Sequence, residues 1–412
     1  MPDLPAGVPR DVPGLWEGHR RWLESRGIEI PRVAIHGGYG KNNLGDDAIL
    51  EVLISRTLEH LPRARLTVVC HGPRVVAERY RHVEQLDACH FKSFAAARAI
   101  VRSHLYIIGG GGIINRINTY SGYRRLKALD PKGKFLFLAA AGAKLFGATT
   151  HFYAVGATSF PDPVVRWLAR HTLGLADLVS VRDPLSLANL RQLGVERNVV
   201  QVLDPALSLR PASPEAARKV LARYGLAAAA RDVVCVGFRY VCDGTTDNDE
   251  KVRRITALCR HLIDERGLGV LFLPASQHPT ERFEDDLDLG RRVRAGLGGE
   301  PAFTLVEEYF HPALTMALFG EVGYSLQERL HALILSAMME TPFLAVAYDQ
   351  KVTEFVRQIG QAHRLLSLEE FMQRTDFGWI DPSWRTRGRR KTAGTPGSPP
   401  PEPAVPGGGA SA

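Results

Sequence analysis

Short apolar runs alternate along most of the chain with segments whose apolar residues recur at helical spacing. The runs of the first half are 32–37, 65–70, 105–110, 151–156 and 178–183, and those of the second half are 233–241, 269–276, 302–309, 321–326 and 343–349. Helical patterns such as 45–61, 249–267 and 328–339 lie between them. Strands that alternate with helices predict parallel sheets covered on both faces, so the expected fold class is α/β.

The alternation is interrupted once, where Ser213 and Pro214 form the cap and first-turn pair of a new helix. A chain of 412 residues is long enough for two domains. We therefore predict two Rossmann-like, doubly wound domains that face a cleft. The predicted divisions are an arm with a short helix over 1–29, a first domain over 30–207, a second over 208–384 and a disordered tail over 385–412, which is rich in Pro, Gly and Ala.

The composition indicates in which cellular environment the protein works and which class of partner it binds. The five cysteines are scattered without a CxxC pair, which favours reduced thiols and a cytoplasmic location. The most apolar stretch, 134–157, is interrupted by Lys144 and Gly147, so it predicts a buried helix followed by a strand rather than a membrane span. The net charge of +8 favours anionic partners. Contact with a membrane would be peripheral, at its inner face, through the basic cluster 385–391 of the tail.

The segment "HGGYGKNNLGDDAIL", residues 36–50, follows the first apolar run. It is neither a GxGxxG dinucleotide motif, because the third glycine comes late, nor a P-loop, because Asn42 follows Lys41. Glycines at the carboxyl end of a strand let the backbone approach a ligand closely, and the amides of a helix start favour an anion or an acidic cap. The alternative is a tight strand-to-helix turn that Asp46 caps.

A second glycine run, Gly109 to Gly112, follows another strand of the same half. Ligands bind at the carboxyl ends of the strands in an open parallel sheet. Two such runs therefore predict a groove in which a bulky polar ligand lies against backbone. The residues that we expect to line it are Gly37, Gly38, Gly110, Gly111, Asn43 and Asp46.

Positive side chains follow three predicted strands of the second half. Arg239 ends one strand, Arg329 and His331 fall in the first turn of the helix over 328–339, and Lys351 follows the next strand. Cations are disfavoured at a helix start unless an anion is bound there, so we predict a site for a small ligand with several negative charges. The alternative is an Arg329–Glu328 pair and a partly buried, satisfied His331.

Two further polar segments have structural interpretations. The acid-rich segment 281–292 lacks a liganding histidine, so it predicts the exposed start of a helix and no metal site. Arg182 and Asp183, at the end of a strand, predict an ion pair between the domains or a lining of the cleft.

Six segments resemble the polysaccharide pyruvyl transferase family, in the family's order, between Arg32 and Phe355. They are "GYGKNNLGDDAIL", "LYIIGGGGII", "VSVRDPLSLANLRQLGV", "DPAL", "RLHALILSA" and "AYDQKV". The resemblance implies a fold similar to GT-B glycosyltransferases and transfer of a pyruvyl group from phosphoenolpyruvate to two hydroxyls of one sugar. It also implies that Arg239, Arg329 and His331 contact the donor. Departures from the family pattern are Asp47 in place of glutamate, Gln350 in place of proline, the acid Glu328 before Arg329, and no acid after the glycine run.

The resulting functional prediction is a ketal-forming pyruvyl transferase that releases phosphate. We expect Arg239, Arg329 and Lys351 to hold phosphoenolpyruvate, His331 to act as general acid and Asp46 as general base. The expected partners are this donor and a glycan or lipid-linked sugar acceptor, without a cofactor, metal or nucleic acid. The alternatives are a GT-B glycosyltransferase that uses a nucleotide sugar and a non-catalytic carbohydrate-binding homologue.

Overall fold

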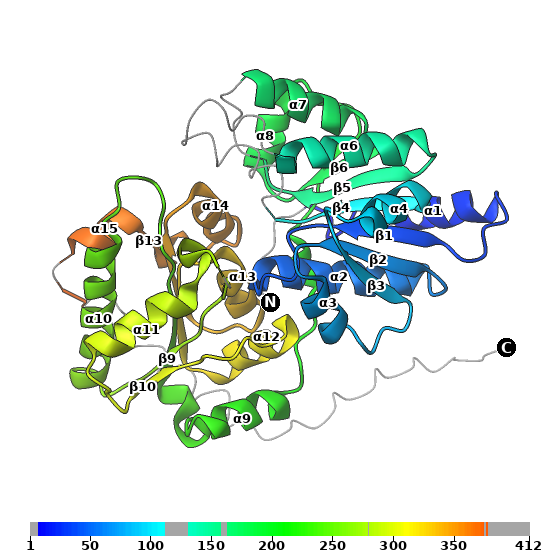
Figure 1. Cartoon of the computed structure of the whole chain (residues 1–412). Helices are drawn as coiled ribbons and strands as arrows, with labels where there is room; N and C mark the ends of the chain where they lie inside the picture. The colour runs from blue at the N-terminus through cyan, green and yellow to red at the C-terminus, as the bar shows by residue number, and fades with distance from the viewer. Residues whose placement is uncertain (1–6, 112–130, 158–162, 279, 375, 378–412) are drawn as a thin grey trace, which may run out of the picture.

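The computed structural model describes residues 7–111, 131–157, 163–278, 280–374 and 376–377, which form two parallel sheets flanked by helices (Figure 1). The first sheet has the strand order β3-β2-β1-β4-β5-β6-β7. Its strands are β1 (Arg32–His36), β2 (Arg65–Cys70), β3 (Leu86–His90), β4 (Leu105–Gly109), β5 (Thr149–Val155), β6 (Leu178–Val181) and β7 (Val199–Gln201).

The second sheet has the order β10-β9-β8-β11-β12-β13. Its strands are β8 (Val233–Gly237), β9 (Gly269–Phe272), β10 (Phe303–Leu305), β11 (Tyr324–Gln327), β12 (Phe343–Ala347) and β13 (Leu365–Ser367). The predicted α/β fold with two doubly wound parallel sheets is therefore confirmed. The predicted boundary between residues 207 and 208 falls inside the short helix η1 (Pro205–Ser208), between the last strand of one sheet and the first strand of the other.

Helices cover both faces of each sheet. In the first half they are α1 (Leu15–Glu24), α2 (Leu44–His60), α3 (Pro73–Arg79), α4 (Phe94–Arg102), α6 (Pro131–Leu145), α7 (Pro163–Gly174) and α8 (Pro184–Gln192). In the second half they are α9 (Pro214–Arg223), α10 (Asn248–Asp264), α11 (Asp286–Gly296), α12 (Pro312–Glu321), α13 (Leu330–Met338), α14 (Gln350–Gln358) and α15 (Leu368–Gln373). Helix α9 begins at the predicted pair, because the Ser213 side chain accepts from the Ala216 amide and Pro214 occupies the first turn.

The central strands are buried along their whole length, which explains their continuous apolar runs. All residues of β4 and of β8 are buried, as expected for parallel strands with helices on both faces. The strands that the sequence pattern missed, β3, β7 and β13, all lie at sheet edges and are partly exposed. An edge strand needs fewer apolar residues, so its sequence signal is weaker.

The most apolar stretch forms helix α6 followed by strand β5, as predicted. The prediction that this helix is buried is wrong in part, because Leu138 is 65% exposed and Leu145 is 83% exposed. No helix in the described parts of the chain has the length and apolar character needed to cross a bilayer. The predicted disordered tail, 385–412, and its basic cluster lie outside the described residues.

The loop between β1 and α2 joins the two halves. The Leu44 amide donates to the carbonyl of Ala275 at 2.8 Å, and the Gln277 amide donates to the carbonyl of Asn42 at 2.9 Å. The Leu44 side chain also belongs to a hydrophobic cluster formed largely by the second half. At this position the two halves are therefore in direct contact.

Candidate functional site

The predicted cations lie at one edge of the second sheet. Strand β11 pairs with β8 on one side and with β12 on the other, so the carboxyl ends of these three strands are adjacent. Arg239 follows the end of β8, Arg329 is the residue before α13, and Lys351 lies in the first turn of α14. The register of the sheet thus brings together side chains that are far apart in the sequence.

Tyr348, between β12 and α14, is the residue around which these cations gather. Arg239 donates from Nη1 to the Tyr348 hydroxyl at 2.9 Å, and its Cζ lies 4.6 Å from the ring centre. The Lys351 Nζ lies 5.1 Å from the same centre. Burial by itself would raise the pKa of the Tyr348 phenol, but Lys351, Arg239 and Arg329 bring it below its ordinary value. Such a cluster has the charge needed to bind an anion.

Arg329 is held by an acid that the sequence analysis did not select. Its Nε donates to Asp286 Oδ2 at 3.0 Å and its Nη2 to Oδ1 at 2.6 Å, which fixes the guanidinium in a bidentate pair. The alternative pairing of Arg329 with Glu328 is therefore wrong. The prediction that segment 281–292 is an exposed helix start is also wrong at Asp286, whose side chain is 1% exposed.

Glu328 belongs to a separate, fully buried ion pair. The Lys251 Nζ lies 2.5 Å from Glu328 Oε1, and both side chains are 0% exposed. The other carboxylate oxygen accepts from the Arg239 backbone amide at 2.9 Å. The charge of Glu328 is balanced by Lys251, and its carboxylate holds the Arg239 backbone in place rather than neutralising Arg329.

His331 reaches across to the first half of the chain. Its Nε2 lies 3.6 Å from the carboxylate of Asp204, and its ring lies against Gly45 at the start of α2. The same carboxylate accepts from Arg182 Nη1 at 2.8 Å. Burial would raise the pKa of Asp204, but Arg182 and His331 hold it well below its usual range.

Arg182 and Asp183 fulfil only one of their two predicted roles. Arg182 pairs with Asp204, within the first half, and Asp183 caps α8 by accepting from the Ser186 amide. The predicted ion pair between the halves is therefore wrong. Both residues do line a crevice between the halves, together with Asp204 and Lys351. This crevice has a volume of about 30 Å³, roughly the space of one water molecule.

The two glycine runs of the first half meet beside the start of α2. A Cβ at Gly111 would lie 2.6 Å from Asp46 Oδ1, and one at Gly110 would overlap Ile49, so only glycine fits at these positions. Both glycines also have positive φ, 53° for Gly110 and 70° for Gly111. His331 touches Gly45, so the proposed acid and base are brought to the same end of α2.

Asn43 and Gly37 have contacts within the chain. The Asn43 side-chain oxygen accepts from the amides of Gly45 and Asp46, so Asn43 is the cap of α2, and the expectation that Asp46 caps it is wrong. That oxygen is therefore not available to a sugar. The space beside Gly37 is filled by the ring of Tyr39, which accounts for the glycine there, and neighbouring Gly38 is also buried.

Asp47, the second acid of the motif, makes buried contacts that stabilise the fold. It is fully buried, lies 2.6 Å from Arg79 Nη1 and accepts from the Tyr309 hydroxyl at 2.6 Å. Burial raises the pKa of Asp47, although Arg79 and Tyr309 both stabilise the charged form. Since Tyr309 belongs to the second half, Asp47 joins the halves, which leaves Asp46 as the motif's acid beside the glycine groove.

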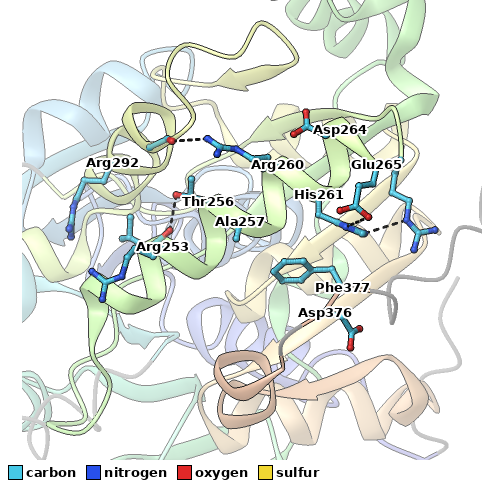
Figure 2. Close-up of a pocket in the computed structure, with 13 residues that line it drawn as sticks. Arg253, Thr256, Ala257, Arg260, His261, Asp264, Glu265, Arg292, Asp376 and Phe377 are labelled. Atoms are coloured by element: carbon cyan, nitrogen blue, oxygen red, sulfur yellow. Dashed lines mark hydrogen bonds and ion pairs between the residues drawn. The ribbon is translucent and has the colours of Figure 1, made fainter.

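A larger hollow, of about 980 Å³, lies on α10 and α11 and contains none of the predicted site residues (Figure 2). Several of the polar groups that line it are already paired. His261 contacts Glu265 and Arg266, and Arg260 donates to the Gly296 carbonyl. Phe377, the last described residue, lies beside His261. The arginines that line it lie on or directly after α10 and α11 rather than at the carboxyl ends of strands, where ligands bind in a parallel sheet, so it is not our candidate site.

Comparison with known proteins identifies the family. Residues 43–350, most of the chain, match the family described as polysaccharide pyruvyl transferase. The chain belongs to the polysaccharide pyruvyl transferase family. Membership indicates a transferase that acts on polysaccharides. A comparison with curated proteins gave no match.

Solved structures show the fold of this pyruvyl transferase family member. The UDP-GlcNAc 2-epimerase from Methanocaldococcus jannaschii aligns with a TM-score of 0.55 and 12% identity, over 88% of this chain and 99% of that chain. Another UDP-N-acetylglucosamine 2-epimerase aligns with a TM-score of 0.52 and 12% identity, over 87% and 90% of the two chains. At this identity the likeness concerns the fold alone, which is GT-B-like.

Three residues of this pyruvyl transferase family member were missed by the sequence analysis: Tyr348, Asp286 and Asp204. Tyr348 and Asp204 lie inside the segments "AYDQKV" and "DPAL" that carry the family resemblance, so attention to every polar residue of those segments would have found them. Asp286 lies in an acidic run without any such signal. Within the described residues, no group of three or more His, Cys, Asp or Glu side chains is placed to hold a metal ion.

Proposed function

We propose that this protein transfers the pyruvyl group of phosphoenolpyruvate to two hydroxyls of one sugar, in a polysaccharide or its lipid-linked precursor, and releases phosphate. The observation that carries the proposal is the meeting of Arg239, Arg329 and Lys351 around Tyr348. Phosphoenolpyruvate combines a carboxylate and a phosphate on three carbons, so it needs several cations within a small volume. Arginine forks suit both of its anionic groups, and lysine adds a point charge.

The chemistry requires a proton donor on one side of the donor and a proton acceptor near the sugar. In the proposed mechanism, the His331 imidazolium gives a proton to the methylene carbon, which becomes a methyl group. The adjacent carbon becomes electrophilic, and the first hydroxyl oxygen adds to it while Asp46 takes the hydroxyl proton. Phosphate then leaves with the electrons of its C–O bond, and the second hydroxyl closes the ketal.

Proton and charge balance is met without a cofactor. Two hydroxyl protons leave the sugar, and one replaces the proton that His331 gives to the methyl group. The other ends on the released phosphate. The fixed cations stabilise negative charge on the leaving phosphate, which is the electrostatic role that a metal performs in other transferases. We therefore propose phosphoenolpyruvate as a donor substrate and no further cofactor.

A phosphate-release assay tests this function directly. Phosphoenolpyruvate is combined with a panel of lipid-linked and nucleotide-linked sugars, and phosphate and the mass of each sugar product are measured. The proposal predicts acceptor-dependent phosphate release and a sugar product that has gained the pyruvate ketal. Binding of a sugar with no phosphate release from any member of the panel would favour a non-catalytic carbohydrate-binding protein.

A glycosyltransferase that uses a nucleotide sugar is the nearest rival, since the structural neighbours are named as UDP-GlcNAc epimerases. That function needs an acid to hold a ribose, and Glu307 and Glu308, which follow β10, are the candidates by position. Both are engaged with arginines, Glu307 with Arg291 and Glu308 with Arg223. A thermal-shift comparison separates the functions, because our proposal predicts stabilisation by phosphoenolpyruvate and none by UDP or GDP.

Asp46→Asn should lower turnover more than it weakens phosphoenolpyruvate binding. The proposed base is lost, while the cations that hold the donor lie at the other sheet and keep their contacts. We expect turnover to fall about 100-fold, the usual lower scale for general base catalysis, with a KM for phosphoenolpyruvate within a few-fold of wild type. Steady-state kinetics measures both constants, and equal turnover in the two proteins would reduce Asp46 to a structural residue.

Tyr348→Phe should mainly weaken donor binding. The change removes the hydroxyl that accepts from Arg239 and leaves the ring beside Lys351. Loss of one hydrogen bond to a charged group predicts a KM for phosphoenolpyruvate about tenfold higher, with turnover little changed. Tyr309→Phe is the matched control, because it removes a hydroxyl that bonds Asp47 at the contact between the halves. A tenfold higher KM in the control as well would assign the effect to general loosening.

A further inference from the structure

Helices α4, α6 and α7 cover one face of the first sheet and present their outer sides to solvent. Helix α6 packs against both α4 and α7, and the inner sides of all three belong to one hydrophobic cluster. Figure 1 shows α6 and α7 side by side on the side of the sheet opposite α2. We call the outer sides of these helices, together with Phe146, the α4–α6–α7 face.

This face exposes large apolar side chains from all three helices. Their exposed fractions are 85% for Phe94, 65% for Leu138, 83% for Leu145, 65% for Phe146 and 58% for Trp167. Single exposed apolar residues are ordinary on a protein surface, but a group on adjoining helices is typical of an interaction site.

The exposed apolar side chains of α6 lie on one side of the helix. Leu138 and Leu145 are seven residues apart, so they lie on one side of the helix. Leu136, Ala139 and Ala143 lie on the inner side and are buried. A helix that is apolar on both sides is normally covered on both sides. Among the side chains of α6 that the structure describes, the outer side is therefore apolar at Leu138 and Leu145.

The charges of these helices have a single sign. Helix α4 carries two arginines, α6 carries three lysines and α7 carries two arginines, and none of the three contains Asp or Glu. Arg98, Arg102 and Arg170 are exposed. Lys144 pairs at 2.7 Å with Asp177, which follows α7. The face therefore combines apolar side chains with an excess of positive charge.

We propose that the α4–α6–α7 face binds the surface of a bilayer that contains anionic lipids. Amphipathic surfaces of this kind insert apolar side chains at the boundary of headgroups and acyl chains, while Lys and Arg attract anionic headgroups. A second copy of the chain is a poorer occupant. A symmetric dimer would place the same face against itself and bring its cations together without acids to balance them.

The surface lies on the half of the chain that holds the proposed acceptor groove. A lipid-linked sugar bound in that groove would have its lipid in the membrane that this face contacts. The membrane inference does not depend on the donor chemistry. It also differs from contact through the basic tail, because every residue in it belongs to described helices or directly follows one.

Sedimentation of the full-length chain with vesicles tests the inference. Vesicles of phosphatidylcholine with phosphatidylglycerol are compared with vesicles of phosphatidylcholine alone, for wild type and for the double variant L145S/F146S. We expect wild type to sediment with the anionic vesicles and the variant to partition at least about tenfold less, because two exposed apolar side chains are lost. Both residues are mostly exposed, so the fold should be unaffected.

Two further variants complete the design. Phe283→Ser removes an apolar ring that is 53% exposed on the second half, and it should sediment like wild type. R98Q/R102Q removes two exposed cations from α4 and should weaken binding about fivefold for each charge. Phosphate release with a water-soluble acceptor should be unchanged in all variants, so failure of the membrane inference is distinguishable from failure of the proposed function.

Three outcomes would overturn the inference. The first is a wild type that does not sediment with anionic vesicles under any salt condition. L145S/F146S could bind as tightly as wild type, which would assign binding to another part of the chain, such as the tail. A dimeric wild type and a monomeric L145S/F146S, without vesicle binding by either, would assign the face to a second copy of the chain.

Discussion

His331→Ala should lower the turnover of phosphate release at least ~100-fold, with a modest loss of stability. The proposed general acid is removed, and no other imidazole occupies its position between Asp204 and the start of α2 in the described structure. Donor binding should change less, because Arg239, Arg329 and Lys351 are retained. Steady-state kinetics and single-turnover phosphate release would measure the effect, and near-normal release would reject His331 as the acid.

His311→Ala is the matched control for this prediction. His311 also belongs to the second half, lies at the start of a helix and contacts a carboxylate of the first half, Glu51, at 3.2 Å. Its replacement removes a similar contact between the halves without touching the proposed chemistry. We expect less than a tenfold change in turnover. A loss as large as that of His331→Ala would mean that contact between the halves, rather than proton transfer, limits the reaction.

Gly45→Ala should lower turnover about 100-fold, although the helix tolerates alanine. Gly45 is in the first turn of α2, and its φ is not positive. Alanine at this position would therefore stabilise the helix by up to ~1 kcal/mol. A Cβ at this position would, however, overlap the His331 ring. The ring or the helix must move, and a displacement of about 1 Å at a catalytic group costs about 100-fold in rate.

Gly18→Ala provides the control for Gly45→Ala. Gly18 lies in helix α1, and no atom would contact a Cβ added there. The control should keep full activity and gain slightly in thermal stability. Full activity in Gly45→Ala would show that the close contact between α2 and His331 is not needed for turnover, and it would weaken the assignment of both residues.

The predicted parts of the site follow from one rule of parallel sheets. Arg239, Arg329 and Lys351 each come just after a strand, and the carboxyl ends of adjacent parallel strands share an edge. The apolar runs located the strands, so the sequence could place these cations at that edge. It could not place Tyr348 at their centre, because aromatic residues after a strand are common and their side-chain directions depend on packing.

The sequence could not predict which charged residues pair with each other. Glu328 is next to Arg329 in sequence, yet it pairs with Lys251, while Arg329 pairs with Asp286, 43 residues away. The first pair is fully buried and the second is largely buried. The cost of a buried unpaired charge forces each charge to find the acid or base that the fold brings close. Likewise, Asp46 and Asp47 are equivalent in the sequence, but only the fold buries Asp47 against Arg79 and Tyr309.

The sequence by itself determined the α/β class, the two sheets, the family and the edge at which the candidate cations lie. These depend on local periodicity and on motifs, which are properties of neighbouring residues. Tertiary structure alone decided the partners of the charges, the contact of His331 with Gly45 and Asp204, and the exposure of α6. Those features depend on which distant segments share a boundary, and that is set only when the whole chain packs.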